Sequence, residues 1–221
     1  MTDVDPRPSY TIRPVADFGQ GEPGAQPWAD IAPLTVDHYL WLENGYRPRV
    51  EVRLCWSTRF LYARFRAEEK RIRVRYMKFQ DPVYKDSCVE FFIDAFPAAR
   101  LGYINFETNA AGTLLAAFGP GRTDRAPLWP EDLAGFMVDS MIPGPVDGEY
   151  GSDAWTLEYR VPLGLFRKLY GQDIGPGHRA AANFYKCGDA TETPHYGAWS
   201  RVDTPAPDFH RPEFFGEVVF G

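Results

Sequence analysis

The chain has 221 residues, of which 44% are hydrophobic and 24% charged, as in an ordinary globular protein long enough for one large domain. Its net charge of −6, without a basic stripe, argues against a nucleic-acid-binding protein. No apolar run is long enough for a transmembrane helix, and the first residues, MTDVDPRPSY, lack the features of a secretory signal, so we expect a cytoplasmic protein without a membrane partner.

The N-terminal third predicts an arm followed by a hairpin, within one domain that spans residues 1–221. Residues 1–27 are rich in Pro, Gly and Asp, and we interpret them as an arm with an edge strand at residues 10–15. Residues 28–42 show no sustained period and are interpreted as a packed arm with a short strand. Strict alternation of apolar and polar residues then predicts two half-buried strands joined by a tight turn, at residues 50–56 and 60–67. Residues 73–79 are expected to extend this sheet.

Two alternating segments organise the middle of the chain: VYKDSCVEFFID at residues 83–94 and GYINFETNAAGTLL at residues 102–115. In each, one face of the expected strand is apolar and the other is partly polar. If the two strands pair, their polar side chains form one field: Glu90, Asp94, Asn105, Glu107 and Asn109. Carboxylates and amides of this kind bind sugar hydroxyls well, but most polar positions on half-buried strands are structural, and a solvated sheet face with a buried hydrogen-bond network shows the same pattern.

The remaining chain predicts further short strands and a single helix. The helix is expected at residues 162–170, PLGLFRKLY, with Pro at its start and Gly171 after its end. The expected strands are residues 113–118, 138–142, 154–161, 180–186 and 214–220, and the expected loops include 119–130, 143–151 and 188–212. Because no strand–helix–strand rhythm is present, the sequence predicts an all-β, mainly antiparallel β-sandwich of immunoglobulin-like or jelly-roll type.

Familiar catalytic and metal-binding signatures are missing. The sequence has no nucleotide-binding glycine loop, no GxSxG and no HExxH motif, and its four histidines lack close metal-ligand spacing. The three cysteines are widely spaced and include no CxxC pair, so we predict that they are buried free thiols. Asp81, Asp86 and Asp94 either contribute to a calcium site or are solvated loop acids. We therefore assign no catalytic residue and no metal ligand from motifs.

Four strings give the chain a family resemblance over residues 28–220: VYKDSCVEFFI, YINFETNAAGT, NFYKCGDATETPHYGAW and FHRPEFFGEVVF. In this order and spacing the chain resembles the carbohydrate-binding module family 9 superfamily, closest to its bacterial family 9-like branch. The resemblance implies a β-sandwich that binds sugar without catalysis of its own, in association with glycosidases and polysaccharide catabolism. It also implies two aromatic rings that clamp a terminal sugar and, in several members, structural calcium.

The resemblance assigns candidate carbohydrate-binding residues one by one. Glu90 matches the family's strand glutamate, and Tyr84 falls near the place of one clamp aromatic, usually Trp. Trp199 is the candidate for the opposite clamp, with Tyr196 or His195 on the same loop as substitutes. The polar field between the clamps is assigned to Asn105, Glu107, Asn109, Asn183 and Lys186. Stacking rings on loops and polar groups on rigid strands suit a pyranose, which has C–H faces and equatorial hydroxyls.

Two rival functions remain open. Related sandwich domains bind haem through Met with His or Lys, and Met77 with Lys85 or His195 is the candidate pair, although a Met in this alternating run is typical of a core. A glycosidase would use Glu90 and Glu107 as its two carboxylates. Our expectation is a non-catalytic protein with a saccharide ligand and no required cofactor. Calcium, haem and the oligomeric state stay undetermined.

Overall fold

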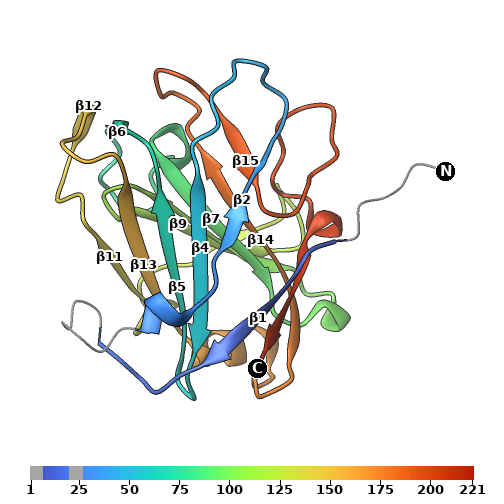
Figure 1. Ribbon diagram of the computed structural model, residues 1–221. Helices are drawn as coiled ribbons and strands as arrows, with labels where there is room; N and C mark the ends of the chain where they lie inside the picture. The colour runs from blue at the N-terminus through green and yellow to red at the C-terminus, as the bar shows by residue number, and fades with distance from the viewer. Residues whose placement is uncertain (1–6, 20–26) are drawn as a thin grey trace.

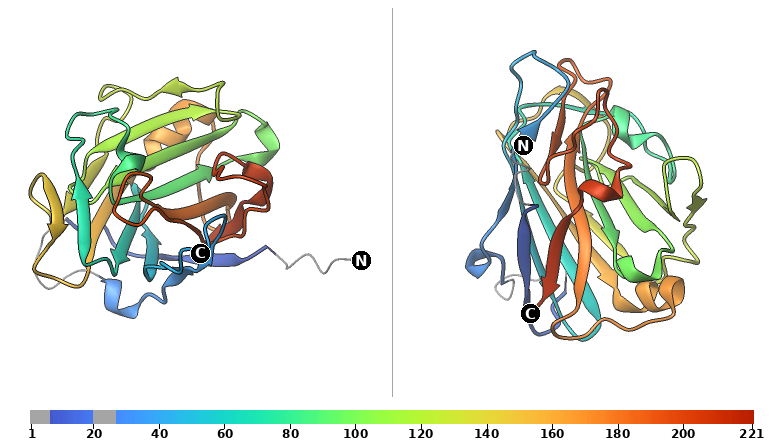
Figure 2. Two further views of the ribbon diagram at one scale, coloured as in Figure 1. Left: turned by 90° about the horizontal axis from the view of Figure 1, so that it is seen from above. Right: turned by 90° about the vertical axis from the view of Figure 1, so that its right-hand side faces the viewer.

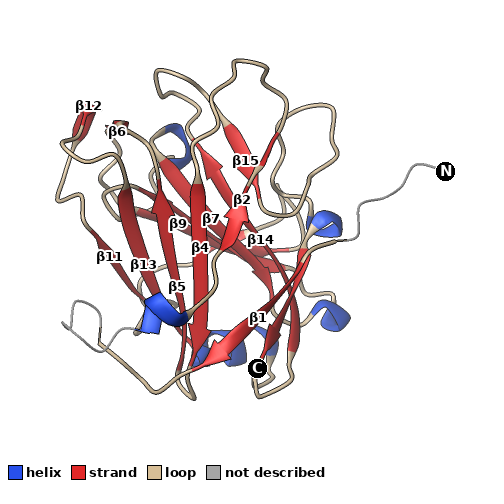
Figure 3. Ribbon diagram, in the orientation of Figure 1, coloured by secondary structure: helices blue, strands red, loops and turns tan. Residues whose placement is uncertain are grey.

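The computed structural model describes residues 7–19 and 27–221, and strands dominate it (Figures 1 and 3). One layer has the strand order β10-β9-β8-β7-β14-β16. Its strands are Ala126–Pro127 (β10), Leu114–Gly119 (β9), Tyr103–Asn109 (β8), Cys88–Asp94 (β7), Arg179–Cys187 (β14) and Gly216–Phe220 (β16). The second layer has the order β4-β5-β13-β11, with Val50–Trp56 (β4), Phe60–Ala67 (β5), Trp155–Pro162 (β13) and Met137–Ser140 (β11).

The two layers face each other across a shared core, as the side view in Figure 2 shows, and the predicted β-sandwich is confirmed. Phe184 of β14 stacks on Phe91 of β7 with a ring-centroid distance of 4.9 Å and reaches Phe65 of the other layer at 6.2 Å. The Tyr159 hydroxyl donates to Thr108 Oγ1 at 2.7 Å, which links β13 to β8 across the core. Alternation directs one face of each strand into this core, as the sequence pattern predicts, and β7 and β8 are buried on their other face as well.

Strand β1, Ser9–Pro14, joins the two layers and is not the edge strand that the sequence suggested. It pairs in parallel with β16 through residues 9–12 and then with β4 through Arg13 and Pro14. The buried Ile12 side chain and the neighbours on both sides explain why this strand lies inside the sheet path. A strand whose flanks are both paired cannot be distinguished from an edge strand by alternation alone.

Several short elements differ from the sequence-based expectation. Strand β6, Arg71–Val74, pairs only with β12, Val146–Glu149, in a small separate sheet, so residues 73–79 do not extend the main one. It ends there because Asp86 Oδ2 accepts the backbone N–H groups of Arg75 and Tyr76. Strand β12 lies in the expected loop 143–151, and β15, Tyr196–Ala198, lies in the expected loop 188–212. Strands β2, Leu34–Val36, and β3, His38–Tyr39, complete the pairing with β4 and β15.

The predicted helix is confirmed as α1, Leu163–Tyr170. Pro162 precedes it, Gly171 ends it with φ 70°, and Leu165, Phe166 and Tyr170 are buried against the core. Short 3₁₀ turns occupy Pro27–Asp30 (η1), Val83–Lys85 (η2), Pro97–Ala99 (η3) and Pro212–Phe214 (η4). None of the helices in the described residues is both long and apolar enough to cross a membrane.

Candidate functional site

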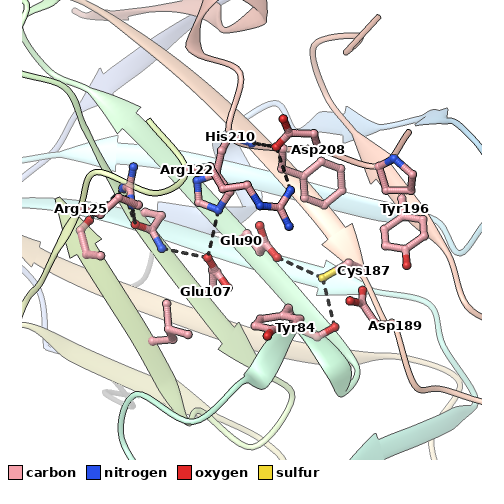
Figure 4. Close-up of a pocket in the computed structure, with 15 residues that line it drawn as sticks. Tyr84, Glu90, Glu107, Arg122, Arg125, Cys187, Asp189, Tyr196, Asp208 and His210 are labelled. Atoms are coloured by element: carbon pink, nitrogen blue, oxygen red, sulfur yellow. Dashed lines mark hydrogen bonds and ion pairs between the residues drawn. The ribbon is translucent and has the colours of Figure 1, made fainter. Parts of the chain in front are cut away.

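The outer face of β8, β7 and β14 carries both an apolar cluster and an open cavity. Loops that pack on this face bury Phe92 of β7, Tyr103 of β8, Tyr185 of β14 and the loop residues Phe209 and Phe215 in one cluster. Where the loops do not meet the sheet, a cavity of about 440 Å³ remains. Its floor is the sheet, and its rim comes from the turn at η2, the loop after β9 and the long loop after β14 (Figure 4).

Two carboxylates lie side by side on the cavity floor. Glu90 of β7 is directly opposite Glu107 of β8 and, on its other side, Tyr185 of β14. The Glu90 and Glu107 side chains are buried to 3% and 5% exposure. Burial raises the pKa of Glu107 to about 7 and holds the pKa of Glu90 well above its ordinary value, with the neighbouring Cys187 and Glu107 adding to the effect. The pair therefore retains a proton near neutral pH, and a protonated carboxyl donates as well as accepts.

A chain of hydrogen bonds continues the polar floor along β8. Asn105 Nδ2 donates to Glu107 Oε1 at 2.8 Å, and Arg125 Nε donates to Asn105 Oδ1 at 3.1 Å. The Arg125 guanidinium also lies 4.3 Å from the ring centroid of Tyr103 and donates to the Tyr103 carbonyl oxygen. This network fixes the orientation of the floor, because the amide of Asn105 is held from both sides.

The walls and rim of the cavity are aromatic and charged. Tyr84 and Tyr196 lie on different sides of the cavity, and His210 stands above the floor (Figure 4). The rim is closed by an ion pair between Arg122 and Asp208, 3.1 Å apart, which ties the loop after β9 to the loop before β16. His210 Nδ1 is 2.8 Å from the Tyr103 hydroxyl, and burial lowers the pKa of His210 to about 4, so the ring is neutral at physiological pH.

Five of the nine predicted carbohydrate-binding residues line this cavity: Tyr84, Glu90, Asn105, Glu107 and Tyr196. Glu90, Asn105 and Glu107 share one sheet face because alternation and the β7–β8 register place them there. Tyr84 arrives from η2 and Tyr196 from the start of β15. Sequence alternation was sufficient for the floor, whereas the two tyrosines depended on the family resemblance.

The other four predicted residues lie elsewhere. Asn109 holds the turn after β8, where its Oδ1 accepts the Ala111 and Thr113 N–H groups. Asn183 is fully buried, and its amide exchanges hydrogen bonds with the backbone of Ser200. These two amides stabilise backbone and are not free for a ligand.

Lys186 and Trp199 are the larger corrections. Lys186 points into the interior, since alternation places it on the opposite face of β14 from Cys187, and its Nζ lies 3.2 Å from Glu69 Oε2 and 2.8 Å from His195 Nε2. Trp199 is 7% exposed and packs edge-on against Phe184 in the core, so it is not placed as a clamp for the cavity.

Several lining residues were missed by the sequence reasoning: Arg122, Arg125, Cys187, Asp189, Asp208, Phe209 and His210. Phe209 and His210 open the string FHRPEFFGEVVF that carried the resemblance, so a signal existed for them. Arg122 and Arg125 lie in a loop rich in Gly, Pro and Arg, where no periodicity applies. Their position depends on how the loop folds back over β8.

The residues predicted as calcium or haem ligands do not lie together in one site. Asp81 accepts the Lys78 N–H, Asp86 accepts backbone N–H groups beside β6, and Asp94 accepts the Phe96 N–H at the far end of β7. Their carboxylate oxygens do not form a group within 4.8 Å of one another in the described residues, so these three acids do not make one calcium site. None of the haem candidates Met77, Lys85 and His195 lines the cavity. Both ring nitrogens of His195 have protein partners, and Met77 is 42% exposed on the surface.

The comparisons with known proteins agree with this architecture. The model of the family described as carbohydrate-binding family 9 matches residues 23–220. A candidate carbohydrate-binding protein from Bacteroides uniformis ATCC 8492 aligns with 97% of this chain and 100% of its own, with a TM-score of 0.85 and 29% identity. A family 9 module from Caldicellulosiruptor kristjanssonii aligns at 14% identity and a TM-score of 0.66. Its glucose complex covers 97% of this chain and 96% of its own, and its cellotriose complex 96% and 93%. The comparison with curated proteins gave no match.

Proposed function

The chain belongs to carbohydrate-binding family 9, and from this membership we propose that the cavity on the outer face of β7 and β8 binds a saccharide. The observation that carries the proposal is the composition of the cavity, in which a rigid polar floor lies between aromatic walls. A volume of about 440 Å³ falls in the range of small-molecule sites. The glucose and cellotriose complexes of the Caldicellulosiruptor module make β-linked glucose the first ligand class to test.

In the proposed complex the floor recognises hydroxyls and the walls hold the ring. Glu90 and Glu107 accept or donate hydrogen bonds according to which carboxyl holds the proton, and Arg122 at the rim adds a donor. Tyr84 and Tyr196 offer ring faces to the C–H faces of a pyranose, and hydrogen bonds hold the backbone of η2 to the segment after β14 and that of β15 to β14. The Asp189 N–H donates to the Tyr84 carbonyl oxygen at 3.1 Å, and β15 pairs with β14.

Isothermal titration calorimetry of the folded protein against glucose, cellobiose and cellotriose tests the proposal. We expect binding that is lost or greatly weakened in Glu90→Gln and Tyr84→Ala and kept in Glu217→Gln, since Glu217 pairs with Arg179 on the surface. A ligand that binds only the folded state must also raise the melting temperature. If a broad panel of mono- and oligosaccharides gives neither heat nor a thermal shift, the saccharide proposal is wrong.

The register of the two carboxylates favours a second candidate, a glycoside-active enzyme. Directly opposite residues on antiparallel strands have Cβ atoms about 5 Å apart, and a retaining glycosidase needs carboxyl groups about 5–5.5 Å apart. An assay with aryl glycosides and cello-oligosaccharides separates the two functions. Turnover that disappears in both Glu90→Gln and Glu107→Gln would favour the enzyme, and binding without turnover favours the module.

A further inference from the structure

Two thiols and one carboxylate meet at the floor of the cavity. Cys88 of β7 is directly opposite Cys187 of β14, and Glu90 lies two residues after Cys88, on the same sheet face. The two Sγ atoms and a carboxylate oxygen of Glu90 all lie within 4.8 Å of one another. Within residues 7–19 and 27–221 this is the one group of three such side chains whose donor atoms are close enough to share an ion. All three residues are buried.

The donor set defines the chemistry of an ion that would fit. Zinc is bound by thiolate sulfur at about 2.3 Å and by carboxylate oxygen at about 2.0–2.2 Å, so donor atoms around one tetrahedral ion lie about 3.5–3.8 Å apart. The three donor atoms lie within 4.8 Å of one another, and Cys187 Sγ is 3.1 Å from Glu90 Oε1, so their separations bracket that spacing. Calcium and magnesium prefer oxygen donors, whereas two sulfur donors select a thiophilic ion.

We propose that Cys88, Cys187 and Glu90 form a three-ligand site for a thiophilic divalent cation of the zinc class. Cys187 and Glu90 line the cavity, so the fourth coordination position faces the open space and would hold water or a ligand atom. Backbone rigidity supports the site. Both cysteines lie in the paired central strands of the layer, where register and not a loop fixes their separation.

The three side chains must lose protons to hold such an ion, and the two arginines of the cavity compensate the charge that remains. Burial raises the pKa of Cys88 to about 11 and that of Cys187 well above its ordinary value, so both thiols are protonated at neutral pH. Binding would release these protons to the buffer. Two thiolates and a carboxylate with one divalent ion leave a single negative charge, and Arg122 and Arg125 line the same cavity with positive charge.

An ion at this site would engage Glu90, the residue that the proposed function places in contact with sugar. The consequence, which rests on that function, is that metal and saccharide compete for the cavity floor. The metal site itself does not depend on sugar binding. Either result can therefore be obtained without the other.

Cobalt is the probe for a direct test. The reduced, chelator-free protein is titrated with Co²⁺ and then with Zn²⁺. We expect one ion per chain, with a thiolate-to-cobalt charge-transfer band that zinc removes. The band should be weakened in Cys88→Ser and in Cys187→Ser and absent from the double variant, and Glu90→Gln should weaken binding about tenfold or more. The matched control is Cys55→Ser, since Cys55 is also a buried free thiol but lies in a separate cluster with Trp28 and Tyr62.

A band that is absent from the wild-type protein, or that survives in the Cys88→Ser/Cys187→Ser double variant, overturns the proposal. If the thiol variants do not fold, zinc calorimetry of the wild-type protein in two buffers of different ionisation enthalpy decides the question. At least two protons released per ion support the site, and fewer than two contradict it. Saturating zinc should then weaken saccharide binding. If no saccharide binds, only the proposed function fails, because the cobalt result stands by itself.

Discussion

The two facing carboxyls, Glu90 and Glu107, are the most perturbed acids of the cavity floor, and their burial has an energetic cost. A buried carboxylate loses hydration, so the folded protein prefers the protonated form. Asn105 offsets part of this cost for Glu107 by donating to its Oε1. Burying these carboxyls therefore lowers the stability of the folded protein, and it places polar groups on the floor of the cavity.

The pH dependence of stability should report this cost. The folded-state pKa of Glu107 is about 7, against an ordinary value of 4.5, so between these values the folded chain binds a proton that the unfolded chain releases. Stability must fall as the pH rises through this window, by about 1–3 kcal/mol. In Glu107→Gln the urea-unfolding free energy should change less between about pH 5 and pH 8. Wild-type-like slopes in Glu107→Gln, with Glu217→Gln as control, would contradict the assignment.

Arg125 has a positioning role that a lysine cannot reproduce. Its guanidinium donates to Asn105 Oδ1 and to the carbonyl oxygens of Tyr103 and Gly121 at once. A lysine lacks this planar fork and would leave acceptors unpaired. Arg125→Lys should lower the unfolding free energy by about 1–3 kcal/mol and weaken saccharide binding. The control is Arg167→Lys. Arg167 lies on α1 and forms an exposed ion pair with Asp173, so this substitution should change neither the unfolding free energy nor saccharide binding. Equal effects of the two substitutions in urea denaturation would refute this role.

At the scale of elements, strand β14 carries different chemistry on its two faces. Its outer face gives Cys187 to the cavity, and its inner face gives Lys186 to a buried network with Glu69 and His195. Burial and the adjacent Lys186 ammonium lower the pKa of His195 to about 2. His195 therefore stays neutral. Its Nε2 accepts from Lys186, and its Nδ1 donates to the Thr193 carbonyl oxygen.

Breaking this network should be costly because the remaining partner is a buried charge. Lys186→Met leaves the buried Glu69 carboxylate without its cationic partner, with the Trp155 Nε1–H as its remaining donor, and should lower the unfolding free energy by about 3–5 kcal/mol. The double variant Lys186→Met/Glu69→Gln should recover part of the loss, as measured by urea denaturation. Lys168→Met removes an exposed pair with Asp132 and should cost no more than about 1 kcal/mol. A Lys186→Met effect as small as this control would contradict the buried-pair argument.

Alternation in the sequence predicted the strands that are buried on one face, because in them the period of two is a direct result of burial. Strands β4, β5 and β13 are of this kind. Strand β7 shows the same alternation although both of its faces are buried, and the helix α1 was predicted from Pro at its start and Gly171 after its end. Short strands such as β12 and β15 were not predicted. Strand β12 is polar and partly exposed along its length, and β15 has Gly and Ala at the positions where large apolar residues would have indicated a strand. Lys186 was misplaced because it was assigned to the same site as Asn183, although alternation along β14 puts these two residues on opposite faces. The cavity rim was missed because loop packing decides it.

At the scale of the molecule, β1 connects the two layers, because it pairs with β16 of one layer and with β4 of the other. Ile12 is fully buried and opposite Phe220 in the last strand, while Arg13 is opposite Cys55 in the second layer. The backbone of Gly221 also donates to the Ile12 carbonyl oxygen. The backbone pairing that joins the two layers at β1 therefore depends on residues 9–14, near the start of the described chain.

Ile12→Ala should destabilise the whole protein. Removing this side chain leaves a void where both layers meet and should cost about 2–5 kcal/mol in unfolding free energy. Thr11→Ala alters an exposed neighbour on the same strand and should cost well below 1 kcal/mol. Thermal and urea unfolding monitored by tryptophan fluorescence measure both. Equal stability of the two variants would mean that β1 does not hold the layers together.

The parallel pairing of β1 with β16 also affects the order of events during synthesis on the ribosome. The partner of residues 9–12 is residues 217–220, so the first strand has no neighbour on that side until nearly the whole described chain has been translated. Contacts of such large sequence separation slow folding. Until residues 217–220 emerge, this side of the first strand stays unpaired, and an unpaired strand edge is exposed to wrong pairing with other chains.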